Sequence, residues 1–275
     1  MNRPITRESY ARRLNRVAEH IWAHLDEPLD LAALAEVACL SPFHFHRIYR
    51  VLIGETVTET VSRLRLQRAS MELARSATPI SEIARRAGYA SNPAFTRAFR
   101  AAYDLAPAAF RAARRAEPGA DPMPVEIQDR PTMRIATVPH RGPPQQIGQA
   151  FDRLMAWAGP KGVVMPPAVG VAVYLDDMSV VPPADQRALA GITVGPEVES
   201  DDTVTIHELP AGRYAVLLYR GPYAQIGKGY EALFGWLSTS GEEPAHAPCV
   251  EVNLNDPRKT APADLLTELC LPLKS

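Results

Sequence analysis

Arginine, histidine and aromatic side chains recur at helical spacing between residues 42 and 52. Phe43, His46, Arg47 and Arg50 fall on one face of the predicted helix, and apolar residues fall on the other face. An arginine can donate two parallel hydrogen bonds to a guanine edge, and an aromatic ring can contact a thymine methyl group. The chemistry of this face therefore favours contact with the bases of a nucleic acid.

A second outward face of the same kind is predicted between residues 92 and 103. Ala94, Arg97 and Arg100 point outward there, and Asn92 opens the segment with a side chain that can pair with adenine. Phosphate contacts position a protein without specifying sequence, and hydroxyl or guanidinium groups can make them. We expect these phosphate contacts from Ser41, Arg50, Ser91 and Arg100.

Glu251 is a carboxylate in an apolar predicted strand, between Val250 and Val252. A buried ionised group needs a partner, and a bound cation would be one. Aromatic faces could add cation–π attraction, and the candidates are Tyr174, Tyr214, Tyr219, Trp157 and Trp236. Two other interpretations stay open: the carboxylate could point to water or pair with an arginine, and the tryptophans could be helix-core residues.

Enzyme and metal motifs are missing from the sequence. We find no Ser–His–Asp arrangement and no phosphate-binding loop, and we predict no metal ion and no cofactor. The three cysteines, Cys39, Cys249 and Cys270, have no metal-binding spacing and form no even disulfide set. They are interpreted as buried free thiols of a reducing compartment.

The arginine-rich segments are the second helices of two predicted helix-turn-helix units. In the first unit Asp30 caps a short helix, a turn at residues 39–41 follows, and Ser41 and Pro42 open the next helix. In the second unit a short helix over residues 79–87 ends at Gly88, which suits a left-handed turn residue, and Ser91 caps the next helix. A long helix over residues 57–74 joins the units. This order is typical of proteins that place the second helix in the DNA major groove.

The motifs of residues 8–115 resemble those of the AraC/XylS transcription regulators. The resemblance is carried by the first-unit segment SPFHFHRIYR and by Ile80-x-x-Ile83-Ala84-x-x-x-Gly88-Tyr89-x-Ser91-x-x-x-Phe95-x-x-x-Phe99-Arg100, followed by Pro107-x-x-Phe110-Arg111. Two positions depart from the family, which often has Gly at Asp104 and Ser or Thr at Ala106. Both lie beyond the second outward-facing helix and bear on the closing turn.

The resemblance implies base-edge contacts from Phe43, His46 and Arg47 in the first unit and from Asn92, Ala94 and Arg97 in the second. Two units joined by a helix would meet successive major-groove segments about one helical turn apart. The resemblance also implies double-stranded promoter DNA as the partner and makes RNA polymerase a candidate partner. The oligomeric state is left open.

The second half of the chain contains an internal duplication. Arg141-Gly142-Pro143, Gln146-Ile147-Gly148, Leu154 and Trp157 return 79 positions later as Arg220-Gly221-Pro222, Gln225-Ile226-Gly227, Leu233 and Trp236. Each copy predicts the order strand, strand, helix, strand, strand. The fold class is therefore multidomain: an all-α double helix-turn-helix domain (1–115), a linker (116–124), and an α+β domain (125–275) with duplicated strand-helix halves and a mainly antiparallel sheet.

The duplicated segment, the strand at residues 189–194 and the segment at residues 250–257 resemble the GyrI-like effector-binding domains. The resemblance implies a cleft between the halves that holds hydrophobic, often cationic, molecules among aromatics and a carboxylate, and Glu251 matches that carboxylate. We expect the ligand to be chosen where the copies differ, as at His140 against Tyr219 and Pro144 against Tyr223. The expected effector-binding residues are Glu251, Tyr174, Tyr214, Tyr219, Tyr223, Trp157 and Trp236.

The sequence features are compatible with three functions. The first is a one-component transcription regulator with a small, hydrophobic or cationic effector. The second is a hydrolase, because some stand-alone relatives use a pocket Glu and Tyr, here Glu251 with Tyr174 or Tyr219 as general base and helper. The third is a DNA-binding protein whose second domain only contacts other proteins.

The charge distribution agrees with two different partners. Residues 1–117 carry 18 Arg, no Lys and 12 acidic residues, which gives a net charge of +6. The remainder has a net charge of −7, so the total is −1. A basic half favours a polyanion, and an acidic half favours cations or neutral molecules. The N-terminus has no apolar run and no window reaches about 18 apolar residues, so we expect a cytoplasmic protein with no membrane partner.

Overall fold

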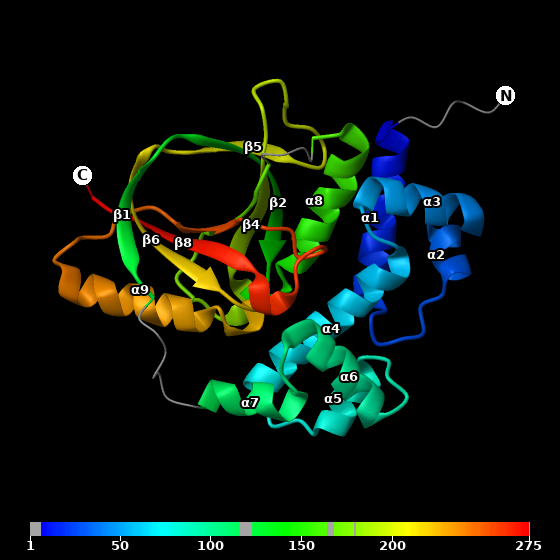
Figure 1. Ribbon diagram of the computed structural model, residues 1–275. Helices are drawn as coiled ribbons and strands as arrows, with labels where there is room; N and C mark the ends of the chain where they lie inside the picture. Colours follow the sequence, from blue (N-terminus) through cyan, green and yellow to red (C-terminus); the bar gives the residue numbers. More distant parts are fainter. Residues whose placement is uncertain (1–6, 116–122, 164–167, 179, 275) are drawn as a thin grey trace. The chain divides into compact units, whose positions relative to one another are not determined.

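The computed structural model describes residues 7–115, 123–163, 168–178 and 180–274. The chain divides into two compact units, Met1–Glu117 with Met155–Val164, and Pro118–Leu154 with Met165–Ser275 (Figure 1). Residues 116–122 of the predicted linker lie outside the described part of the chain. None of the helices within the described ranges is long and apolar enough to cross a membrane.

The N-terminal unit is helical, as predicted. Its helices are α1 (Arg7–Ala23), α2 (Leu31–Val37), α3 (Pro42–Ile53), α4 (Val57–Arg75), α5 (Ile80–Arg86), α6 (Asn92–Tyr103) and α7 (Pro107–Arg115). The predicted caps are present: Asp30 accepts a hydrogen bond from the Ala33 N–H at 2.7 Å, and Ser41 accepts from the His44 N–H at 3.3 Å. Ser91 accepts from the Ala94 N–H at 3.4 Å. The caps at Ser41 and Ser91 fix where the two outward-facing helices, α3 and α6, begin.

The helices α3 and α6 end in the same way. Gly54 has φ 88° and Asp104 has φ 58°, and their N–H groups donate to the carbonyls of Arg50 and Arg100. Aspartate is one of the few side chains tolerated in the left-handed region. The turn therefore closes in the usual way even though position 104 is an aspartate and not the glycine that the family often has.

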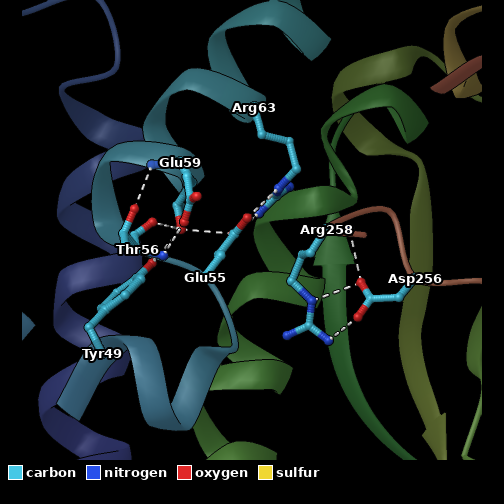
Figure 2. A network of polar contacts seen from close by, with 8 residues as sticks. Tyr49, Glu55, Thr56, Glu59, Arg63, Asp256 and Arg258 are labelled. Atoms are coloured by element: carbon cyan, nitrogen blue, oxygen red, sulfur yellow. Dashed lines mark hydrogen bonds and ion pairs between the residues drawn. The ribbon is translucent and has the colours of Figure 1, made fainter. Parts of the chain in front are cut away.

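The cores of the two helix-turn-helix units are built differently. In the second unit Phe95, Phe99, Tyr103 and Phe110 form an aromatic cluster with ring centroids 4.4–5.5 Å apart. In the first unit the buried Tyr49 hydroxyl donates to Thr60, Thr60 donates to Glu55, and Glu55 accepts two hydrogen bonds from the Arg63 guanidinium (Figure 2). This polar chain fixes α3 against α4. The Asp256–Arg258 pair in the same figure is local to the segment that follows residue 253.

The C-terminal unit has the predicted eight strands in one curled antiparallel sheet. They are β1 (Val125–Arg130), β2 (Met133–Arg141), β3 (Gly170–Tyr174), β4 (Arg187–Thr193), β5 (Thr205–Leu209), β6 (Gly212–Arg220), β7 (Cys249–Asn253) and β8 (Leu266–Pro272). The short helical turn η1 (Pro144–Gln146) leads into α8 (Gly148–Lys161), and η3 (Tyr223–Gln225) leads into α9 (Gly227–Ser240). Two further short turns, η2 (Pro183–Asp185) and η4 (Pro262–Asp264), precede β4 and β8.

The order of the strands shows that the duplication is an approximate two-fold symmetry. The order is β1-β6-β8-β7-β3-β4-β2-β5. If β1–β4 are exchanged with β5–β8, the same order results, read from the other end of the sheet. The central pair is β3 with β7, where Ala172 lies opposite Glu251. These two residues are also equivalent in the duplication, 79 positions apart. The symmetry axis therefore passes between Ala172 and Glu251.

Candidate functional site

The outward faces of α3 and α6 have the same pattern of exposure. From Ser41 to Arg50 and from Ser91 to Arg100, exposed, half-buried and buried residues follow in identical order. Both arginines of each helix are exposed, and so is Phe43, with 74% of its surface accessible. The Arg47 guanidinium carbon lies 5.7 Å from the centre of the Phe43 ring, which is a cation–π distance.

The other predicted DNA-contact residues lie on or beside the same two faces. Ser41, Ser91 and Asn92 are exposed at the first turns of the helices, where backbone N–H groups and the helix dipole favour anions. His46 and Ala94 are half-buried. The structure thus brings the predicted residues together in two sets, and their individual base and phosphate contacts stay predictions.

The C-terminal unit contains a buried carboxylate held by two phenols. Only 6% of Glu251 is exposed. The Tyr230 hydroxyl of α9 donates to its Oε1 at 2.9 Å, and the Tyr174 hydroxyl of β3 donates to its Oε2 at 3.0 Å. Strand alternation places Glu251 on the sheet face that α9 covers, because its neighbour Leu269 on β8 packs in the core beneath that helix.

The electrostatics of this site follow from burial. Burial raises the pKa of Glu251 to about 7, although the hydrogen bonds from Tyr230 and Tyr174 act in the opposite direction. Burial, and then the charge of Glu251, raise the pKa of both phenols well above the usual value. Burial also raises the pKa of the nearby Cys249 to about 11, with a contribution from Glu251. All three neighbours therefore stay protonated near neutral pH.

The described part of the chain places no cationic side chain against Glu251. Among the side chains that the structure describes, its polar partners are the two phenols, and no Arg, Lys or His pairs with it. The alternative of an arginine partner and the alternative of a solvent-facing carboxylate therefore both fail. A buried anion without a counter-ion is costly, so this position favours either a proton or a positively charged ligand.

The predicted aromatic residues are dispersed. Tyr174 contacts Glu251, and the Tyr223 phenol contributes to the raised pKa of Tyr174. Tyr219 packs under α9 on the same face, and its hydroxyl donates to the Pro222 carbonyl at 3.1 Å. Trp236 is half-buried against the same core.

Tyr214 is not brought to the carboxylate, and Trp157 belongs to the segment Met155–Val164, which groups with the N-terminal unit. Tyr214 packs with Val216 and Val250 on the opposite face of the sheet, and its hydroxyl donates to the Pro210 carbonyl. Trp157 is buried in α8, and the Lys161 ammonium lies 4.9 Å from its ring centre.

Tyr230 was missed by the sequence analysis. Its equivalent in the first half is Phe151, so the comparison of the copies that singled out Tyr219 and Tyr223 would also have found it. Within the described ranges, no group of three or more His, Cys, Asp or Glu could hold a metal ion.

The fold and the two sites define a two-unit protein that pairs a double helix-turn-helix with a duplicated ligand-binding α+β unit. The model of the GyrI-like small molecule binding domain matches residues 123–274, and a helix-turn-helix domain model matches residues 34–113. The chain belongs to the family of GyrI-like small-molecule-binding domains, carries an AraC-type helix-turn-helix domain, and is a DNA-binding transcription regulator. The predicted families, fold class and function are confirmed.

Known proteins similar to this chain match it over different shares of its length. Regulatory protein SoxS of Salmonella typhimurium is 31% identical over 103 residues, which are 38% of this chain and 96% of SoxS. Right origin-binding protein of Escherichia coli is 33% identical over 93 residues, which are 33% of this chain and 32% of that protein. A cryo-EM structure of an EcmrR–DNA complex covers 89% of this chain and 99% of its own, with 13% identity and a TM-score of 0.48.

Proposed function

We propose that the protein regulates transcription in response to a small lipophilic cation, and that Glu251 binds the positive charge of this effector. One observation carries the proposal: Glu251 is 6% exposed and has no cationic partner among the described residues. An incoming cation would take the role that a proton plays in the free protein. The hydroxyls of Tyr174 and Tyr230 already contact the carboxylate, so their rings would lie near the same charge.

The symmetry argues for an effector with one positive charge. The three residues of the site have different equivalents in the other half: Ala172 for Glu251, Phe151 for Tyr230 and Asn253 for Tyr174. A side chain on Gly170 would come within 3.5 Å of Phe151 and 3.4 Å of Asn253, so these residues meet on the same face of the sheet. One half of the site is therefore anionic, and the other is neutral. We infer a ligand with a cationic end and an apolar end.

The proposed effector site comprises Glu251, Tyr174, Tyr230 and Tyr223, with Tyr219 and Trp236 in the supporting core. Tyr214 is left out because it lies on the other face of the sheet, and Trp157 is left out because its ring is already occupied by Lys161.

On the DNA side we infer that α3 and α6 enter successive major-groove segments. The exposed arginines, with the caps at Ser41 and Ser91, support this placement. We also infer domain boundaries at 1–115 and 125–275, with the linker between them. A promoter-bound regulator of this kind would act on RNA polymerase in the cytoplasm.

A second candidate function is hydrolysis in the C-terminal domain. It is favoured by one observation: a pKa of about 7 suits a general base, and Tyr174 and Tyr230 stand beside Glu251 as proton donors. The proposed helper would be Tyr174, since Tyr219 donates elsewhere. Product formation from an electrophilic substrate that disappears in Glu251→Gln would favour this candidate. Saturable binding without turnover would favour the sensor.

The sensor is tested by calorimetric titration of lipophilic cations into the full-length protein at pH 8. We expect Glu251→Gln to weaken binding by about 10- to 100-fold, or roughly 1.4–2.8 kcal/mol. Glu126→Gln is the matched control, because Glu126 is an exposed carboxylate of the same unit. Equal affinities of Glu251→Gln and wild type would remove Glu251 from the proposed role.

A further inference from the structure

Arg65 and Arg68 lie near the middle of α4, three residues apart and thus on one side of the helix. The Arg65 guanidinium donates to the Leu25 carbonyl at 2.9 Å and to the Glu27 carbonyl at 2.6 Å. Arg68 donates to the Asp26 carboxylate at 2.6 Å. Both arginines therefore hold the loop between α1 and α2, which belongs to the first helix-turn-helix unit.

The same two guanidinium groups contact the second helix-turn-helix unit. Arg68 also donates to the carbonyl of Arg86, the last residue of α5, at 3.1 Å. Arg65 packs against the turn that follows, since a Cβ atom on Gly88 would lie 2.5 Å from Nη1 of Arg65. Gly88 has φ 81°, so glycine serves both the turn and this close approach. The pair thus bridges the loop before α2 and the turn before α6.

Two adjacent cations need such partners to stay together. Burial, and then the charge of Arg68, lower the pKa of Arg65, while Asp26 and Tyr89 act in the opposite direction. The carbonyls of Leu25, Glu27 and Arg86 supply further acceptors. Charge-assisted hydrogen bonds of this kind are stronger and more directional than neutral ones.

The rest of α4 divides between the two units. Val57, Val61 and Leu64 pack in the core of the first unit with Phe45 and Tyr49 of α3. Further along, the Tyr103 hydroxyl of α6 donates to the Leu66 carbonyl. The arginine pair therefore stands where the two cores meet, and it is placed to resist rotation of one unit against the other.

We propose that the Arg65–Arg68 pair fixes the distance and angle between α3 and α6, and thereby the number of base pairs that the operator must have between its two half-sites. The proposal rests on DNA binding by both helix-turn-helix units. One inserted base pair moves a half-site by about 3.4 Å and turns it by about 35° around the duplex. A rigid pair of recognition helices rejects such a site, and a loosened pair tolerates it.

The test uses the full-length protein and a set of operators selected by the wild type. The half-sites are kept, and the spacer is lengthened or shortened by one base pair. We expect the wild type to bind the changed spacers about 100-fold more weakly. Arg68→Ala and Arg65→Gln should reduce this discrimination to less than about 10-fold, while the base preferences within each half-site stay the same.

Two further variants keep the test decisive. Asp26→Asn removes a charged acceptor of Arg68 from an exposed loop position and should relax the spacing in the same direction, even if the arginine variants do not fold. Arg12→Ala is the control, since Arg12 pairs with Glu8 on an exposed surface of α1, and it should keep the wild-type ratio. Folded variants that keep the full spacing discrimination, or that lose affinity equally at every spacing, would overturn the proposal. A wild type that binds no selected duplex would instead contradict DNA binding itself.

Discussion

Glu251 and Ala172 lie opposite each other on the two central strands, at positions that the duplication makes equivalent. One member of the pair is a carboxylate with a pKa of about 7, and the other is a methyl group. The sheet is approximately symmetric, but only one side of its axis carries an ionisable group. The proposed effector specificity depends on this difference.

Placing a second carboxylate at the axis should change the charge of the preferred ligand. In Ala172→Glu the two carboxylates would face each other with Cβ atoms about 5 Å apart, and like charges at this distance favour retention of a proton. We expect the ratio of dication to monocation affinity to rise by at least about 10-fold at pH 8. Calorimetric titration with a monocation and a dication of otherwise similar structure measures this ratio. Ala172→Gln controls for size, and an equal rise in Ala172→Gln would exclude charge as the cause.

Removing the phenol hydroxyls should raise the pKa of Glu251. Tyr230→Phe and Tyr174→Phe each delete one hydrogen bond to the ionised carboxylate, and such bonds stabilise the charged form. Phenylalanine already occupies the equivalent of position 230 in the other half, as Phe151. We expect the pH midpoint of effector binding to move up by about one unit in each variant. Tyr214→Phe, on the opposite face, should leave the midpoint unchanged, and an equal shift there would contradict the assignment.

The exposed arginines of the recognition helices should separate into two classes. Arg47→Ala should cost about 1–3 kcal/mol and relax the preference at one base pair, because a base contact is lost. Arg50→Ala should weaken all duplexes alike and lower the salt slope of the binding constant by about one, because a phosphate contact is lost. Arg97→Ala and Arg100→Ala should repeat this division in the second unit. Competition binding against single-base variants at two salt concentrations distinguishes the classes, and a uniform loss in Arg47→Ala would refute its base contact.

The left-handed residue at the end of α6 offers a test of local stability. Asp104 has φ 58°, where a side chain is strained and glycine is not. We expect Asp104→Gly to raise the free energy of unfolding of the helical domain by about 0.5–1 kcal/mol, and Asp104→Ala to lower it. Urea unfolding followed by helical circular dichroism measures both variants. If Asp104→Gly were less stable than the wild type, the aspartate side chain would stabilise the folded domain by more than the left-handed backbone destabilises it.

Periodicity and capping residues predicted most of the helices and the strands of this fold, but not α7 or the short helical turns. Asp30, Ser41 and Ser91 mark the helix starts that the structure has, and the eight predicted strands are all present. Signals of this kind are local, since a cap or an alternating strand depends on neighbours in sequence. The duplication then limited the topology, because two equal halves must pair in equivalent ways.

The site was only partly predictable, because it depends on which face of the sheet each side chain takes. Tyr214 and Tyr219 are five positions apart on one strand, so they point to opposite faces, and both could not line one site. Its difference from Phe151 in the other half marks Tyr230 as a candidate, but its contact with Glu251 comes from a helix, and no periodicity reveals which helix turn meets which strand. The bridge of Arg65 and Arg68 was equally hidden, since its acceptors are backbone carbonyls whose positions only the fold determines.

The pH dependence of effector affinity tests the central claim most directly. In the proposed site the ionised form of Glu251 would bind the cation, and burial raises the pKa of Glu251 to about 7. Binding would therefore displace a proton at lower pH. For the wild type we predict an association constant that rises about tenfold per pH unit below pH 7 and levels off above it, as measured by calorimetry of one permanently charged ligand from pH 5.5 to 8.5. Glu251→Gln should bind weakly with no such rise. A flat profile in the wild type, or the same rise in Glu251→Gln, would contradict the proposal that Glu251 binds the effector.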